Sequence, residues 1–250
     1  VPLHFEKAEL VAKFAIDASG KVVGFMIQPA QAAAPAPAAA VPDDANFSER
    51  ELAVGDDERA LPATLAMPKG DGPFPAAVLV HGSGPHDRDE TIGPNKPFLD
   101  IARGLATQGI AVLRYEKRTR ARPQDFASGV FGVDEETTND AVQAVAALRA
   151  LDGIDPKRVF VLGHSQGGMM APRIAAVSGH VAGLVLLAAP ARSLLDIVIE
   201  QNRRLAVLDD QKTSDAERDA ITALIQQVRS IRDPATDAAT TSVHGAPAAY

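Results

Sequence analysis

Short apolar segments alternate with segments of helical pattern along most of this 250-residue chain, and this alternation constrains the fold more than any other feature. Buried strands that alternate with helices predict an α/β fold, a mostly parallel sheet with helices on both faces. The predicted strands are 48–54, 58–67, 76–80, 109–115, 158–163 and 181–189, and the predicted helices between them are 97–108, 134–151 and 166–178.

The first 46 residues have a different character from the rest of the chain. Residues 3–27 predict a β-hairpin, which is only marginally stable alone and therefore indicates the end of a larger module. Twelve of the fourteen residues from Pro29 to Pro42 are Ala or Pro, which favours an extended linker. We predict a hairpin remnant of an N-terminal module at 1–28, a linker at 29–46 and an incomplete α/β domain at 47–250.

Beyond the last predicted strand, the sequence predicts two amphipathic helices, 192–208 and 215–231. The second helix starts with a capping box, in which Ser214 precedes Glu217 by three residues. Its apolar residues form one stripe along the helix.

Composition limits the classes of function. The chain has 46% hydrophobic residues, a net charge of -7 and scattered Lys and Arg residues, so we expect no nucleic-acid partner and a small-molecule substrate. The absence of cysteine excludes disulfides and thiolate zinc sites, and we predict neither a metal nor a cofactor. No apolar run reaches the roughly 18 residues of a membrane span. No signal peptide is visible, but because the chain starts at Val1 rather than Met we expect upstream sequence to be missing, which slightly favours a secreted or periplasmic location over a cytoplasmic one.

The segment "VFVLGHSQGGMM", residues 159–170, carries the strongest functional signal. Gly163-x-Ser165-x-Gly167 lies between a predicted buried strand and a predicted helix, the setting of a nucleophile elbow. Small residues at 163 and 167 permit the tight turn, and the serine then projects above the sheet. The alternative is that Ser165 only caps the helix.

A second glycine-rich segment, "LVHGSGPHDRDE" at 79–90, follows another predicted strand. Acyl transfer needs backbone N–H groups that stabilise an oxyanion, and we assign this role to Ser83, with Gly84 as the next choice, and to Gln166. The alternative is an ordinary glycine turn. The residues expected to support the two turns are His81, Gly82, Gly84, Gly163, His164 and Gly167. We expect His86 to contact substrate.

The segments "HGSGPHDRDETIGPNKPF", "GIAVLRYEKRTR", "DPKRVFVLGHSQGG" and "VAGLVLLAAP" together resemble the α/β-hydrolase superfamily. The resemblance covers residue 47 to about residue 210 and is greatest to bacterial dienelactone-hydrolase-like and acyl-peptidase-like serine esterases. Dienelactone hydrolases proper use cysteine, whereas this chain has Ser165. The resemblance implies that 192–231 form a lid over the acyl site, and that the hairpin ends a small α+β module.

The resemblance also implies a triad acid and histidine after Ser165 in the chain. The sequence offers only His180, in a turn at the far end of the following helix, and His244, with no apolar strand before it. The nearest carboxylates lie in the predicted lid or directly after it. We therefore expect the chain to be truncated at both ends, its last strands missing, and these 250 residues to be nearly inactive alone.

These observations predict a serine hydrolase that cleaves carboxylic esters through an acyl-enzyme. An acyl-peptidase or a thioesterase would share the elbow and the oxyanion hole. A non-catalytic binding module on the same fold is the alternative from another class. The basic run "RYEKRTRAR", residues 114–122, is interpreted as a solvated loop with acidic partners.

Overall fold

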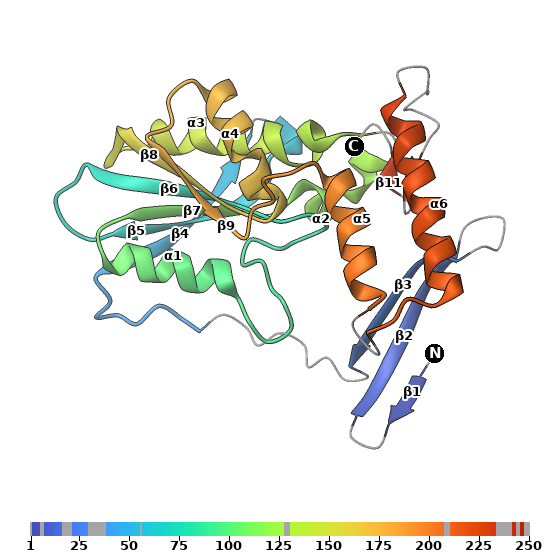
Figure 1. The fold of residues 1–250 in the computed structure, drawn as a ribbon. Coiled ribbons are helices and arrows are strands. Elements are labelled where there is room, and N and C mark those ends of the chain that lie inside the picture. The colour runs from blue at the N-terminus through green and yellow to red at the C-terminus, as the bar shows by residue number, and fades with distance from the viewer. Residues whose placement is uncertain are drawn as a thin grey trace.

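We describe the chain from a computed structural model. The residues described are 2–5, 8–16, 22–29, 39–55, 57–127, 131–207, 211–233, 242–243 and 246–247. Three sheets and nine helices or helical turns are formed by these residues (Figure 1).

The strands of the main sheet are β4 (Phe47–Val54), β5 (Leu61–Pro68), β6 (Phe74–Val80), β7 (Ala111–Tyr115), β8 (Ile154–His164) and β9 (Gly183–Leu187). The helices and helical turns are η1 (Asp57–Arg59), α1 (Pro97–Thr107), α2 (Arg118–Ala121), η2 (Pro123–Phe126), η3 (Asp134–Thr138), α3 (Asn139–Arg149), α4 (Gln166–Ser178), α5 (Leu194–Leu205) and α6 (Asp215–Arg232). The remaining strands are β1 (Pro2–Phe5), β2 (Ala8–Ile16), β3 (Val22–Pro29), β10 (Ser242–Val243) and β11 (Ala246–Pro247).

The main sheet confirms the predicted α/β class. Its strand order is β4-β5-β7-β6-β8-β9. The pairs β7/β6, β6/β8 and β8/β9 are parallel, whereas β4/β5 and β5/β7 are antiparallel. Since the carboxyl ends of parallel strands lie at one edge of a sheet, the loops after β6 and β8 meet there.

Helices cover both faces of this sheet, as Figure 1 shows. On one face, α3 and α4 pack against the central strands through a cluster that includes Val78, Val145 and Ile174. On the other face, α1 contributes Phe98 and Ala102 to a second cluster. Apolar side chains on both faces of β6 explain why its sequence is a continuous apolar run rather than an alternating pattern.

The N-terminal strands form a sheet of their own. The two predicted hairpin strands are present as β2 and β3, which pair antiparallel. The structure adds a third strand, β1, which pairs antiparallel with β2. The division of the chain at the Ala/Pro-rich segment stays a prediction.

The helices predicted at 134–151, 192–208 and 215–231 are present with small differences in their bounds. The predicted helix 134–151 begins as a wide π-helical turn, η3, and continues as α3. The two helices after β9 are α5 and α6, and the capping box of Ser214 and Glu217 is present. They pack on each other through a small cluster centred on Leu224 and Val228.

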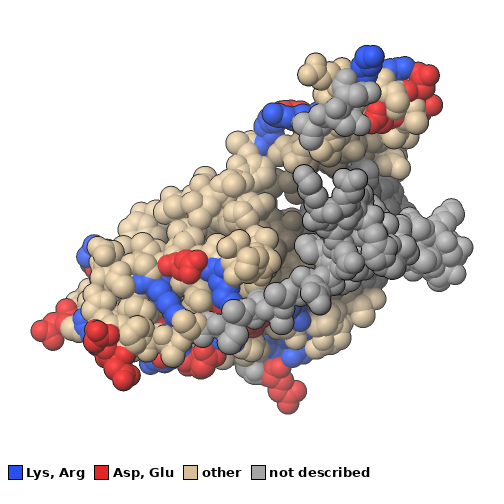
Figure 2. Space-filling model, turned by 90° about the horizontal axis from the view of Figure 1, so that it is seen from below, with Lys and Arg blue, Asp and Glu red and all other residues tan. Residues whose placement is uncertain are grey.

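The two outer strands of the main sheet differ in their side chains. In β4 the central residues are Glu49, Arg50 and Glu51. In β9, Val185 and Leu186 are exposed by 43% and 50%. On the face of the molecule drawn in Figure 2, positive and negative side chains are interspersed, and neither sign forms a continuous patch among the residues drawn in colour.

Candidate active site

Ser165 occupies the sharp turn between β8 and α4, as the sequence predicts. Its backbone has φ 50° and ψ −115°, a conformation that non-glycine residues rarely adopt. The Ser165 N–H donates to Leu187 O of β9 at 2.9 Å, and Met169 N–H donates to Ser165 O at 2.9 Å. The turn is therefore fixed by hydrogen bonds on both sides of the serine.

The glycines of this turn are required by close backbone contacts. A Cβ added at Gly163 would lie 2.3 Å from Gly167 O, and one added at Gly167 would lie 2.2 Å from Val80 O. Gly168, which the sequence analysis did not single out, is equally restricted: its Cβ would lie 2.7 Å from Gly163 O. The Gly-Gly pair directly after the serine is the sequence signal that indicates this restriction.

The loop after β6 approaches the elbow closely. A Cβ added at Gly82 would lie 3.4 Å from Ser165 Cβ. Gly82 N–H donates to Glu90 Oε1 at 2.7 Å, and Gly84 N–H donates to Glu136 Oε1 at 3.2 Å. Between these two, the N–H of Ser83 has no acceptor within the described part of the chain.

Two buried glutamates, Glu90 and Glu136, connect this loop to the residues beside Ser165. Glu90 Oε1 lies 2.9 Å from His164 Nδ1, and Glu136 Oε2 accepts from Gln166 Nε2 at 3.1 Å. The sequence pattern predicts a role for neither glutamate. Glu136 comes from the π-helical turn η3, whose side chains at 136–138 are buried beside the elbow rather than on a solvated helix face.

Lys117 is the cation of this buried network. Its Nζ donates to Gly82 O at 2.6 Å, to Glu136 Oε1 at 2.6 Å and to Gln166 Oε1 at 3.1 Å. Burial lowers the pKa of Lys117 below its ordinary value, and the neighbouring Glu136 opposes this shift. Lys117 thus holds the loop after β6 by a carbonyl oxygen, while the glutamates hold it by its N–H groups.

The histidines at positions 81, 86 and 180 differ in their burial and in their contacts. His81 is buried against Phe98 and Tyr115, and burial lowers its pKa to about 3, so its ring is neutral. His86 Nε2 lies 2.8 Å from Ser83 O, on the loop itself. His180 is exposed beyond the end of α4, about 20 Å from the elbow by the rise of a 13-residue helix.

No described residue forms a hydrogen bond with the hydroxyl of Ser165. The structure thus brings together the predicted serine, the Ser83 segment and Gln166, but no histidine base among the described side chains. His244 lies outside the described residues.

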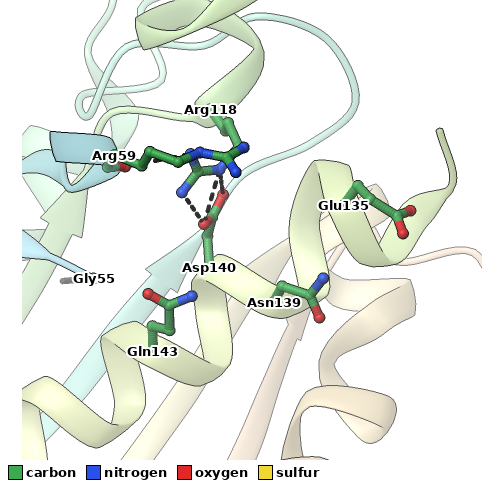
Figure 3. A pocket seen from close by; sticks show the side chains of 7 residues that line it. All are labelled: Gly55, Arg59, Arg118, Glu135, Asn139, Asp140 and Gln143. Atoms are coloured by element: carbon green, nitrogen blue, oxygen red, sulfur yellow. Dashed lines mark hydrogen bonds and ion pairs between the residues drawn. The ribbon is translucent and has the colours of Figure 1, made fainter. Parts of the chain in front are cut away.

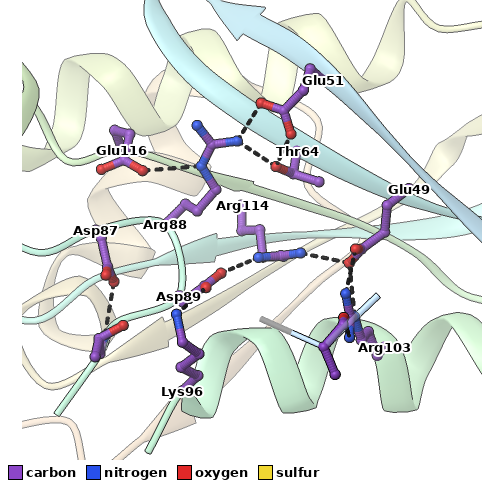
Figure 4. A network of polar contacts seen from close by, with 12 residues as sticks. Glu49, Glu51, Thr64, Asp87, Arg88, Asp89, Lys96, Arg103, Arg114 and Glu116 are labelled. Atoms are coloured by element: carbon purple, nitrogen blue, oxygen red, sulfur yellow. Dashed lines mark hydrogen bonds and ion pairs between the residues drawn. The ribbon is translucent and has the colours of Figure 1, made fainter. Parts of the chain in front are cut away.

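The basic run at 114–122 has acidic partners, as expected, but several of its side chains are buried rather than solvated. Arg114 is 4% exposed and pairs with Glu49 and Asp89 (Figure 4). Asp89 also accepts from Lys96 Nζ at 3.1 Å, and its carbonyl accepts from Phe98 N–H. This network fixes the downstream end of the loop that carries Ser83.

A separate polar cavity of about 420 Å³ lies between η1, α2 and the start of α3 (Figure 3). Arg118 and Asp140 are paired with each other in its lining, where Arg118 Nη2 donates to Asp140 Oδ1 at 2.7 Å. Its lining includes no residue of the elbow or of the loop after β6. Since both of its arginines are already paired, Arg118 with Asp140 and Arg59 with Asp125, we assign it no ligand.

Among the described residues, no group of three His, Asp or Glu side chains is arranged to hold a metal ion. No helix in that part of the chain is long and apolar enough to cross a membrane.

Comparisons with known proteins identify the family of this chain. The sequence profile of the alpha/beta hydrolase family matches residues 77–249. The chain is similar to the esterase EstD of Thermotoga maritima, with 44% identity over 207 residues, which are 82% of this chain and 48% of that protein. The chain therefore spans about half the length of this relative.

Solved structures similar to the chain include a bacterial heroin esterase, with 26% identity, 63% of this chain and 49% of that chain covered, and a TM-score of 0.48. They also include the dienelactone hydrolase-like promiscuous phosphotriesterase P91 from metagenomic libraries, with 17% identity, 74% and 78% of the two chains covered, and a TM-score of 0.47.

Proposed function

Because this chain belongs to the alpha/beta hydrolase family, we propose that it hydrolyses carboxylic esters through an acyl-enzyme on Ser165. The observation that carries the proposal is the strained serine turn beside the N–H of Ser83, which has no acceptor among the described residues. The 44% identity to an esterase supports the choice of an ester as the substrate.

In the proposed reaction, Ser165 Oγ attacks the carbonyl carbon of the ester and loses its proton to a general base. The carbonyl oxygen becomes an oxyanion that accepts hydrogen bonds from the N–H groups of Ser83 and Gln166. Collapse of this intermediate breaks the ester C–O bond, and the leaving alkoxide takes the proton. Water then repeats the sequence on the acyl-enzyme and releases the acid.

The general base is proposed to be a histidine other than the described ones near the elbow. His81 is buried, and His164 and His86 are held beside Glu90 and the Ser83 carbonyl. A hydroxyl without a base reacts slowly, so the proposal includes the supply of this histidine from outside the described residues.

We extend the proposal to α5 and α6, as a lid over the acyl site. The carboxyl end of β9 lies at the elbow, because Leu187 O accepts from Ser165 N–H. The chain enters α5 at Leu194, seven residues later. The two helices pack on each other through their own apolar cluster, which allows them to move as a unit.

The test is covalent labelling of the serine. The chain is treated with a fluorophosphonate and with p-nitrophenyl acetate, and adduct mass and p-nitrophenol release are measured for the parent chain, Ser165→Ala and Ser48→Ala. Because we expect the triad base to be missing from these 250 residues, the parent chain should react slowly, and its adduct at Ser165 should be absent from Ser165→Ala. Ser48, on the outer strand β4, is the matched control and should leave both signals unchanged.

A measurable adduct of the parent chain that is equally abundant in Ser165→Ala would refute the nucleophile. Parallel measurements with a thioester and an acyl-peptide anilide would identify a thioesterase or an acyl-peptidase if either substrate reacted faster than the ester.

A further inference from the structure

Three consecutive residues of the loop after β6 correspond to three consecutive residues of the elbow. Gly82 is joined to His164 through Glu90, at 2.7 and 2.9 Å. Gly84 is joined to Gln166 through Glu136, at 3.2 and 3.1 Å. The middle residues of the two triplets are Ser83 and Ser165, the two residues to which we assign the reaction.

We propose that Glu90 and Glu136 are positioning residues that set the Ser83 N–H opposite Ser165, and we name these two links the carboxylate brackets. The inference rests on the proposed function, because it gives the Ser83 N–H its role. With the N–H groups on either side engaged, the peptide that contains the Ser83 N–H cannot rotate without breaking a buried hydrogen bond. Such preorganisation is what makes an oxyanion site effective.

Carboxylates suit this task because one of them accepts from several donors at once. Glu136 uses both oxygens: Oε1 accepts from Gly84 N–H and Lys117 Nζ, and Oε2 accepts from Gln166 Nε2. Glu90 uses only Oε1, for Gly82 N–H and His164, and its Oε2 accepts no hydrogen bond from the described residues. We therefore expect Glu90→Gln to be tolerated better than Glu136→Gln.

Burial makes the brackets rigid. Glu90 is 1% exposed and Glu136 is 4% exposed, so a hydrogen bond lost at either carboxylate is not readily replaced by water. Lys117 compensates the charge of Glu136 and also binds Gly82 O. Loop carbonyl, loop N–H and elbow side chain are thus held by one connected set of buried groups.

The experiment measures the affinity for phenylboronic acid, which forms a tetrahedral adduct with a serine Oγ and places a negative oxygen where the oxyanion develops. A neutral compound of similar shape, benzamide, measures binding that does not need the oxyanion donors. In Glu136→Gln, the single remaining acceptor oxygen cannot serve donors on both sides. We expect boronate affinity to fall about 10- to 100-fold, part of the effect of losing an oxyanion donor, while benzamide affinity stays unchanged.

Four further variants make the result specific. Glu90→Gln keeps the oxygen that both donors use, so it should stay within about threefold of the parent chain, whereas Glu90→Ala should lose affinity as Glu136→Gln does. Gln166→Met cuts the second bracket from the elbow side and leaves the Gln166 N–H in place, which provides a test if Glu136→Gln fails to fold. Asp140→Asn is the matched control, since Asp140 is a buried carboxylate paired with Arg118 away from the elbow.

Amide hydrogen exchange of Gly82 and Gly84 gives a readout that does not depend on reactivity. Faster exchange at Gly84 in Glu136→Gln, with the rest of the sheet unchanged, is expected. The brackets would be overturned if Glu136→Gln left the exchange of Gly84 unchanged, or if its boronate affinity equalled that of Asp140→Asn. If Ser165→Ala binds the boronate as well as the parent chain does, the proposed function fails, and the exchange measurement alone decides whether the carboxylates hold the loop.

Discussion

The buried ring of His81 predicts a loss of stability in mild acid that can be measured directly. The ring is fully buried under the loop that carries Ser83, with its centroid 5.1 Å from that of Phe98 and 5.3 Å from that of Tyr115. Burial, with the nearby charges of Lys117 and His86, lowers its pKa from 6.5 to about 3. The folded chain therefore keeps the ring neutral where the unfolded chain protonates it.

The sign and size follow from proton linkage. Between pH 6.5 and about 3 the unfolded state binds one more proton at His81 than the folded state, so the free energy of unfolding falls as the pH falls through this range. Each pKa unit is worth about 1.4 kcal/mol, which gives about 2 kcal/mol of lost stability at pH 5 and about 5 kcal/mol at pH 3. Above pH 6.5 this contribution to the pH dependence ends.

The assay is urea unfolding at a series of pH values for the parent chain and for His81→Phe, which keeps a flat ring at the position. Other groups also titrate in acid, so the relevant quantity is the difference between the two chains. We expect this difference to change by about 2 kcal/mol in favour of His81→Phe between pH 7 and pH 5. Exposed His180, changed to Asn, is the control. A difference that stays constant from pH 7 to pH 4 would refute the reasoning.

Two further predictions concern close packing and buried charge. Gly167→Ala places a Cβ 2.2 Å from a neighbouring carbonyl oxygen and should lower the free energy of unfolding by about 1–3 kcal/mol or more, measured in urea, whereas Gly104→Ala, a helical position with no atom within 4 Å, should raise it by about 0.5–1 kcal/mol. Lys117→Met leaves the buried carboxylate of Glu136 without its cation and should cost about 3–5 kcal/mol in the same assay. For the exposed ion pair of Arg173, the change to Met should cost less than about 1 kcal/mol, and equal losses in the two variants would contradict the argument.

The sequence predicts those parts of the fold and site that depend on local pattern. Apolar runs followed by helical periodicity identify the sheet and its covering helices, and the turn around Ser165 is visible because its glycines are close in sequence. The glycine pattern also locates Ser83, since a loop after a buried parallel strand must lie at the carboxyl edge of the sheet.

The carboxylate brackets could not be predicted in this way. Glu136 is separated by 52 residues from Gly84, and Glu90 by 74 residues from His164, so no local spacing indicates either contact. The π-helical turn that carries Glu136 has the same polar and apolar pattern as the start of an ordinary helix. Contacts with residues distant in sequence also explain why Lys117 is buried, although it stands in a run of charges typical of a solvated loop.

The two outer strands of the main sheet give the chain an uneven tendency to associate. Strand β4 carries Glu49, Arg50 and Glu51 at its centre, and charged side chains on an edge strand discourage the addition of another strand. Strand β9 displays Val185 and Leu186 beside backbone groups that no described strand pairs on its outer side. An exposed apolar edge strand favours pairing with a further strand, so of the two edges of this sheet β9 is the one that favours self-association.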